Sequence, residues 1–224
     1  MDLFSMQQTI SERLLKSSLP RALAGGTATR EQYRAYVVDV YHYARHSSQV
    51  IGMSATRLVL SHPKMAAYLF QHAEEELGHD VWAASDLRDL GMSESQIAAS
   101  APSDPCLQML GLEYLYAAHL NPVGLFGWMF ALESLGAKVG GSIALMLNKT
   151  LSLECKALQF LTGHAEADTT HAADLISVIS SEAKASEDIT VIERMAFLST
   201  DLYVRILDAA AASGPAGKRH EQRS

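Results

Sequence analysis

The stretch QHAEEELGHD, residues 71–80, places two histidines and three glutamates in a chain that is 48% hydrophobic. Within it, His72, Glu76 and His79 are spaced i, i+4 and i+7, so on one continuous helix their side chains would project from a single stripe. Apolar residues such as Ala73 and Leu77 lie between them. The stripe is therefore either a solvated helix face or one wall of a metal site.

A second segment repeats this pattern. In GHAEADTTHAADL, residues 163–175, His164, Asp168 and His171 again stand at i, i+4 and i+7. Imidazole and carboxylate groups together suit a borderline metal such as Fe(II), Mn(II) or zinc, and a helix presents them on one face only at such spacings. One stripe alone is weak evidence, whereas two stripes in one small chain favour a metal site.

Glu133 stands alone among apolar and small side chains in GLFGWMFALESLGAKVGGSIALML, residues 124–147. This pattern predicts that its carboxylate is buried, and an uncompensated buried carboxylate costs several kcal/mol. A metal ion would compensate the charge. The alternative is a structural glutamate that is protonated or hydrogen-bonded to the protein.

A third polar group occurs earlier, in YRAYVVDVYHYARHSSQ, residues 33–49. Asp39, His42 and His46 are spaced i, i+3 and i+7 among tyrosines. The structural alternative is stronger here, because a core histidine often bonds a tyrosine or a backbone carbonyl. This group therefore contributes candidate ligands of lower rank.

The fold class follows from apolar residues that recur at helical spacing, without strands of period 2. We predict an all-α protein with a single domain over residues 1–212 and a disordered tail over 213–224. The expected helices cover about 5–18, 30–60, 61–90, 106–119, 122–148, 151–181 and 187–211. Gly91 to Pro105 form the main loop.

The composition of the chain indicates which classes of binding partner to expect. The formal net charge of −7 argues against nucleic acid, because phosphate binding needs clustered Lys and Arg. Cys106 and Cys155 lack CxxC spacing, and neither a signal peptide nor a membrane span is visible. We expect a cytoplasmic protein that acts on a small-molecule substrate without a membrane partner, with a homodimer as the assembly to consider.

Three pieces of the sequence resemble one known family. EEELGHD, the isolated Glu133 and HAEADTTH are similar to the metal-binding segments of the haem-oxygenase-like di-iron oxidases and oxygenases, which are iron-containing redox enzymes of the haem-oxygenase and thiaminase II-like fold. The separations also match, with 54 residues from His79 to Glu133 and 31 from Glu133 to His164. The resemblance covers about residues 30–210 and implies a haem-oxygenase-like multi-helix bundle.

The resemblance also implies a set of iron ligands. It assigns Glu133 to both metals, with the remaining ligands Glu76, His79, His164, Asp168 and His171. Family members usually supply another glutamate from the early helix, and His42 occupies the corresponding region here. Because a neutral histidine replaces a carboxylate, a single iron, or a second iron that binds only with substrate, stays open. His72, His46 and Asp39 are the second choices for metal ligands.

The expected function is that of an iron-dependent oxidoreductase, a non-haem di-iron oxygenase or oxidase. It would use two Fe(II) ions and O2 to oxidise a small organic substrate, with no catalytic residues beyond the metal ligands. Three alternatives remain open: a thiaminase II-like hydrolase, a haem-binding oxygenase and a metal-free structural bundle. The hydrolase would need a nucleophile in the pocket, and the haem protein would need one early histidine but not the other His and carboxylate positions.

Overall fold

The computed structural model describes residues 2–153 and 157–214, without the side chains of residues 134–140 and 164–170. This described part is built from helices and contains no strand, so the all-α prediction is confirmed. The helices are α1 (Leu3–Leu15), α2 (Ser18–Ala24), α3 (Arg30–Leu58), α4 (Pro63–Glu75), α5 (His79–Asp89), α6 (Glu94–Ala98), α7 (Asp104–Ala118), η1 (Pro122–Gly124), α8 (Leu125–Leu151), α9 (Gln159–Glu182) and α10 (Ser186–Ala212).

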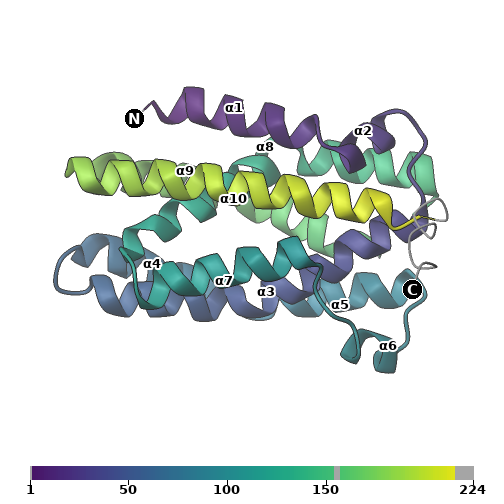
Figure 1. Ribbon diagram of the computed structural model, residues 1–224, viewed down its shortest axis with the longest axis horizontal. Coiled ribbons are helices and arrows are strands. Elements are labelled where there is room, and N and C mark those ends of the chain that lie inside the picture. Colours follow the sequence, from purple (N-terminus) through teal and green to yellow (C-terminus); the bar gives the residue numbers. More distant parts are fainter. Residues whose placement is uncertain (1, 154–156, 215–224) are drawn as a thin grey trace, which may run out of the picture.

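The long helices α3, α8, α9 and α10 run roughly along the long axis of the molecule (Figure 1). Helix α8 packs against α9 and α10, and α3 packs against α4, α5 and α7. A Cβ atom added at Gly127 would lie 2.1 Å from the backbone oxygen of Ile192, so only glycine permits this approach of α8 to α10. Helix α8, which carries Glu133, therefore packs against both α9 and α10.

The ends of α3 and α7 are fixed by local hydrogen bonds. Thr29 and Gln32 form a capping box at the start of α3, and the Gln32 amide also donates to the backbone oxygen of Ala211 at the end of α10. Ser103 caps α7 by accepting from the backbone N–H of Cys106. These caps set where each helix begins and hence which face it turns to its neighbours.

The prediction of one helix over residues 61–90 is wrong. Helix α4 ends at Glu75, and α5 begins at His79 after a turn in which Gly78 adopts φ +91°. Glycine has no Cβ and takes this left-handed conformation at little cost. Residues Glu76, Leu77 and Gly78 therefore break the helix, and the spacing of apolar residues does not reveal the break. His72, Glu76 and His79 therefore do not share the stripe of one continuous helix.

Two short helices lie where the sequence predicts breaks. Pro20 is the third residue of α2, in the first turn, where a missing N–H leaves no helical hydrogen bond unmade. Helix α6, inside the predicted main loop, starts with a capping box of Ser93 and Gln96. The structure begins α9 at Gln159, later than the predicted 151, and the predicted tail from residue 215 onward lies outside the described residues.

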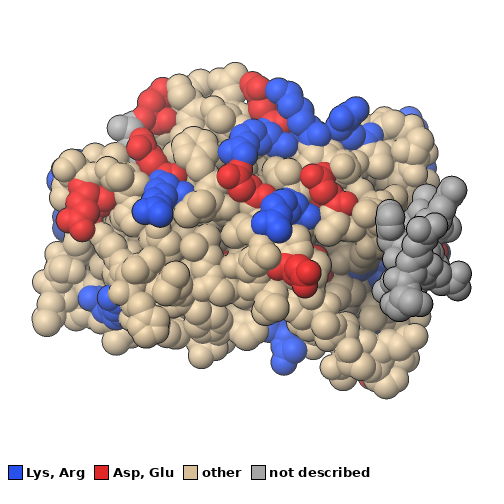
Figure 2. Space-filling view, viewed as in Figure 1, with Lys and Arg blue, Asp and Glu red and all other residues tan. Residues whose placement is uncertain are grey.

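The surface carries charges of both signs. Figure 2 shows Lys, Arg, Asp and Glu side chains interleaved over the part of the view where α1 and α10 lie, and few over α7. In the described chain, every helix is too short or too polar to cross a membrane.

Candidate metal centre

Six titratable side chains meet where the end of α4 and the start of α5 face α8 and α9. We refer to them as the His–Glu cluster: His72, Glu75, Glu76, His79, Glu133 and His171. Helix α8 supplies Glu133 and α9 supplies His171, so residues up to 99 positions apart in sequence, from His72 to His171, contribute to one site. Five of the six were predicted as first or second choices.

His72 lies at the centre of the cluster and is only 3% exposed. Its Nε2 atom is 3.0 Å from Oε1 of Glu133 and 3.9 Å from Oε1 of Glu76. Its Nδ1 atom is 3.6 Å from Oε2 of Glu75. A residue that the sequence ranks as a second choice thus contacts three carboxylates.

Glu75 links α4 to α9. Its Oε2 atom lies 3.2 Å from Nε2 of His171. One ligand-type atom each from His72, Glu75 and His171 lies within 4.8 Å of the others, close enough to hold one metal ion. Glu75 is not among the predicted ligands, although its i+3 spacing from His72 is the signal that would have found it.

Glu76 and His79 meet across the helix break. Oε1 of Glu76 lies 3.1 Å from Nδ1 of His79, because the turn at Gly78 folds the start of α5 back toward the end of α4. The His79 ring stacks on Trp82 with a centroid distance of 4.4 Å. The two residues therefore form a second donor group beside the first.

Trp82 itself is held against α9. A Cβ atom added at Gly163 would lie 2.8 Å from Cζ3 of Trp82, so the glycine makes room for the indole ring. Asp86, one turn further along α5, accepts hydrogen bonds from the backbone N–H groups of Gln159 and Phe160 at 2.8 and 3.0 Å. These contacts fix α9 relative to α5 and so position His171 relative to His79.

The carboxylates of the cluster stabilise positive charge at its centre, as the pKa of His72 shows. Burial on its own would lower the pKa of His72, but the hydrogen bond and charge of Glu133, with the charges of Glu76 and Glu75, reverse this and raise it. Burial and the charge of Glu133 also raise the pKa of Tyr68, whose ring stacks on His72 at 5.7 Å. Each buried carboxylate thus favours a positive charge nearby.

The donor set fits iron. Three imidazoles and three carboxylates converge, and the Nδ1 atom of His171 is buried without a hydrogen-bond partner among the described residues. Mixed imidazole and carboxylate ligation suits non-haem iron. His72, Glu75 and His171 can hold one ion, and Glu133 and the Glu76–His79 pair lie beside this group.

Two predicted ligands cannot be placed. The side chains of His164 and Asp168 lie outside the described residues. Their backbone positions belong to α9, seven and three residues before His171, which is the spacing of one helix face. Their role as ligands therefore stays a prediction.

The structure does not bring the polar residues of α3, Asp39, His42 and His46, to the His–Glu cluster. Asp39 accepts hydrogen bonds from the backbone N–H and the hydroxyl of Ser103, both at 2.7 Å. His42 Nε2 lies 3.0 Å from the hydroxyl oxygen of Ser100, and His46 Nδ1 lies 2.8 Å from that of Tyr114. All these contacts are with α7 or the loop before it, so the structure gives no support to His42, His46 or Asp39 as ligands.

A buried acid on α7 was also missed. Glu113 is 0% exposed, neither carboxylate oxygen has a hydrogen-bond partner among the described residues, and burial raises its pKa well above the usual range. In LQMLGLEYLYAA it is the lone acid of an apolar segment, which is the same sequence signal that singled out Glu133. The signal predicts burial, and it does not predict partners.

A comparison with protein families gives the class of the molecule. Residues 34–203 match the model of a family described as iron-containing redox enzymes, and this match covers most of the chain. The chain belongs to this family. No curated protein matches it.

Solved structures confirm the fold. A domain of unknown function from Shewanella denitrificans, described as having a heme oxygenase-like fold, superposes with a TM-score of 0.85 at 24% identity, covering 94% of this chain and 92% of that one. A TenA homologue from Pseudomonas syringae pv. tomato gives a TM-score of 0.73 at 11% identity, with coverages of 93% and 90%. A TenA homologue from P. horikoshii OT3 gives 0.75 at 12%, with coverages of 95% and 97%. The predicted haem-oxygenase-like bundle is thereby confirmed.

Proposed function

We propose that this protein is a non-haem di-iron oxygenase or oxidase that uses O2 to oxidise a small organic substrate. The observation that carries the proposal is the convergence of three imidazoles and three carboxylates from α4, α5, α8 and α9. Iron held by such ligands supplies one-electron and O2 chemistry that side chains alone do not provide. Membership of an iron-containing redox family supports the choice of iron.

Two metals are proposed because the donors fall into two groups. His72, Glu75 and His171 form one group, whose ligand atoms lie within 4.8 Å of one another. Glu76 and His79 form the other at 3.1 Å. The resemblance assigns Glu133 to both metals and adds His164 and Asp168 on α9.

The surrounding aromatic residues would hold His72 and His79 in place and shield these two imidazoles from water. Tyr68 stacks on His72, and Phe126 stacks on Tyr68 at 5.9 Å, so aromatic rings cover one side of the central imidazole. Trp82 covers His79 on another side. A dry setting strengthens the interaction of each carboxylate with a bound cation.

A thiaminase II-like hydrolase is the less favoured alternative. The TenA homologues share 11% and 12% identity with this chain and show the fold alone. Cys106, the described cysteine, is fully buried on α7, and burial together with the charges of Asp39 and Glu113 raises the pKa of its thiol. A buried neutral thiol is a poor nucleophile. Cys155 lies outside the described residues.

A haem oxygenase is also less favoured. Haem iron needs an axial ligand such as histidine and no cluster of carboxylates. His42 and His46, the early histidines, are hydrogen-bonded to Ser100 and Tyr114. The proposal therefore keeps non-haem iron, with a cytoplasmic location and a small-molecule substrate as further parts of it.

The proposal can be tested by O2 consumption. Protein loaded anaerobically with ferrous iron should consume O2 faster than the same concentration of iron in buffer. Glu76→Gln removes a buried carboxylate of the cluster and should abolish this excess. Glu74→Gln is the matched control, since Glu74 is an exposed glutamate two residues earlier, in the last turn of α4, and should leave O2 consumption unchanged. Equal rates for the parent protein and free iron would defeat the proposal.

A further inference from the structure

A tyrosine hydroxyl lies beside the His–Glu cluster and has no place in the proposed set of metal ligands. Tyr68 is on α4, one turn before His72. Its ring is nearly parallel to the His72 imidazole, with an interplanar angle of 13° and a centroid distance of 5.7 Å, and it also stacks on Phe126 of α8. These two ring contacts restrict the orientation of the phenol.

The Tyr68 hydroxyl is surrounded by negative charge. Four carboxylates are close enough for their charges to act on it, those of Glu133, Asp174, Glu75 and Glu76. None of them accepts a hydrogen bond from it, because the hydroxyl oxygen is buried and has no hydrogen-bond partner among the described residues. The O–H group of Tyr68 therefore remains available to donate to a further acceptor.

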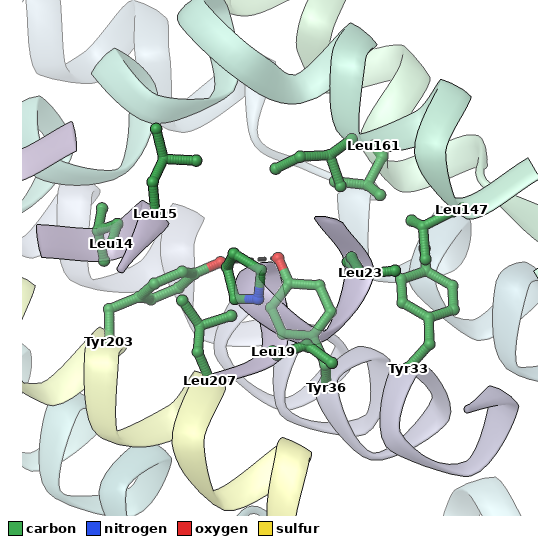
Figure 3. Close-up of a pocket in the computed structure, with 12 residues that line it drawn as sticks. Leu14, Leu15, Leu19, Leu23, Tyr33, Tyr36, Leu147, Leu161, Tyr203 and Leu207 are labelled. Atoms are coloured by element: carbon green, nitrogen blue, oxygen red, sulfur yellow. Dashed lines mark hydrogen bonds between the residues drawn. The ribbon is translucent and has the colours of Figure 1, made fainter. Parts of the chain in front are cut away.

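Other buried tyrosines of the bundle do have hydroxyl partners. Figure 3 shows Tyr36 and Tyr203, whose hydroxyl oxygens are 2.8 Å apart in a hydrogen bond. The Tyr203 hydroxyl is also 3.3 Å from that of Tyr43. Within the described part of the chain, Tyr68 is the one tyrosine whose hydroxyl oxygen is buried without a partner.

An unpartnered hydroxyl of this kind does not help the chain to fold. Its hydrogen bonds to water are lost on burial and are not replaced, which destabilises the folded state. A phenylalanine would keep the ring contacts with His72 and Phe126 without this cost. The hydroxyl of Tyr68 therefore calls for a role in binding rather than in folding.

We propose that the Tyr68 hydroxyl donates a hydrogen bond to a small anion bound at the His–Glu cluster. This inference rests on the proposed function, because a metal ion supplies the positive charge that lets an anion bind among carboxylates. A phenol carries its proton at neutral pH, whereas the carboxylates around it are acceptors. A hydrogen bond to a charged acceptor is also stronger than one between neutral groups. Tyr68 would thus select and orient anionic ligands.

Azide binding to the iron-loaded, oxidised protein tests the proposal. Azide on ferric iron gives a visible absorption band, so an optical titration yields its dissociation constant. Tyr68→Phe should raise this constant at least about tenfold, because a hydrogen bond to a charged group contributes about that factor or more. Tyr36→Phe is the matched control, since it also removes one buried hydroxyl, whose partner is Tyr203 and not the cluster, and it should leave the constant unchanged.

The same two variants give a second readout without iron. Tyr68→Phe should melt at the temperature of the parent or above it, because the hydroxyl that it removes has no partner. Tyr36→Phe should melt about 2 to 4 °C lower, because it breaks the hydrogen bond to Tyr203. A lower melting temperature in Tyr68→Phe would show that its hydroxyl bonds within the fold, and would overturn the proposal.

Failure of this inference and failure of the proposed function give different results. A parent protein that retains iron but binds azide no more tightly than Tyr68→Phe, or binds none, would overturn the inference alone. Loss of iron from Tyr68→Phe would make Tyr68 a ligand of the metal, and would also overturn it. A parent protein that retains no iron would defeat the proposed function and the inference with it.

Discussion

Two regions of the molecule contain similar polar residues that have different partners. On the α4, α8 and α9 side, the imidazoles and carboxylates of the His–Glu cluster contact one another at 3.0 to 3.9 Å. On the α7 side, Asp39, His42 and His46 each bind a neutral hydroxyl or backbone group, and Glu113 has no partner among the described residues. Helical spacing is thus a property of one helix, whereas a metal site needs faces of several helices to converge.

The largest expected difference between the two regions is the effect of their buried glutamates, Glu133 and Glu113, on iron affinity. Glu133 is 8% exposed and lies 3.0 Å from a histidine, and Glu113 is 0% exposed on α7. Glu133→Gln should lower iron affinity by more than about 100-fold, since even residues that merely support metal ligands are worth about 10 to 100-fold. Glu113→Gln should leave iron affinity unchanged. The measurement is the rise in melting temperature on adding ferrous iron without oxygen.

That prediction fails in either of two ways. An iron-dependent rise of the same size in Glu133→Gln and the parent would remove Glu133 from the site. Loss of the rise in Glu113→Gln, with the circular dichroism spectrum unchanged, would instead place Glu113 in metal binding.

The histidines of the two sides give the next largest effect. His72→Ala should reduce iron affinity at least about tenfold, because His72 contacts three carboxylates of the cluster. His42→Ala should leave it unchanged, since the described contacts of His42 are with Ser100 and Tyr41. Iron per chain after gel filtration measures both. Reduced iron in His42→Ala would restore His42 to the site.

The isolated acid should also make stability depend on pH. Burial raises the folded pKa of Glu113 above its ordinary value of 4.5, so the folded state keeps a proton that the unfolded state releases. Its contribution is fully present below pH 4.5 and is lost as pH rises, by up to about 1.4 kcal/mol per pH unit. Urea unfolding of iron-free parent and Glu113→Gln from pH 5 to 7 should diverge accordingly, with the variant gaining. Parallel curves would mean that Glu113 is not a protonated buried acid.

The smallest expected effect concerns the turn that joins α4 to α5. Gly78→Ala forces a residue with a Cβ into φ +91° and should destabilise the protein by about 1 kcal/mol. Gly111→Ala, within α7 and with open space around its Cβ, should stabilise it by up to about 1 kcal/mol. Chemical denaturation compares the two. A stability gain in Gly78→Ala would contradict the left-handed turn.

The sequence predicts much of the fold and part of the site. Apolar periodicity correctly predicts an all-α protein, and the isolated acid and repeated His-carboxylate spacing identify Glu133, Glu76, His79 and His171 as candidates that the structure brings together. Glu75 was missed because it lies off the i, i+4, i+7 stripe of His72, Glu76 and His79, although it is one turn from His72 on α4. A break at Gly78 changes the phase of every later side chain, and no spacing rule reports it.

Helical spacing also does not predict which neighbouring helix a polar group contacts. Asp39, His42 and His46 have a convincing spacing, but which side of α3 faces which helix is decided by packing over the whole bundle. Ser100, Ser103 and Tyr114, which bind them, are unremarkable in sequence.

The central claim is that the His–Glu cluster binds non-haem iron. Its most direct test is iron analysis of the parent protein after anaerobic loading and gel filtration, with an optical spectrum of the same sample. We expect two irons per chain and no haem absorption band. Protein without retained iron, or iron accompanied by a haem spectrum, would contradict it.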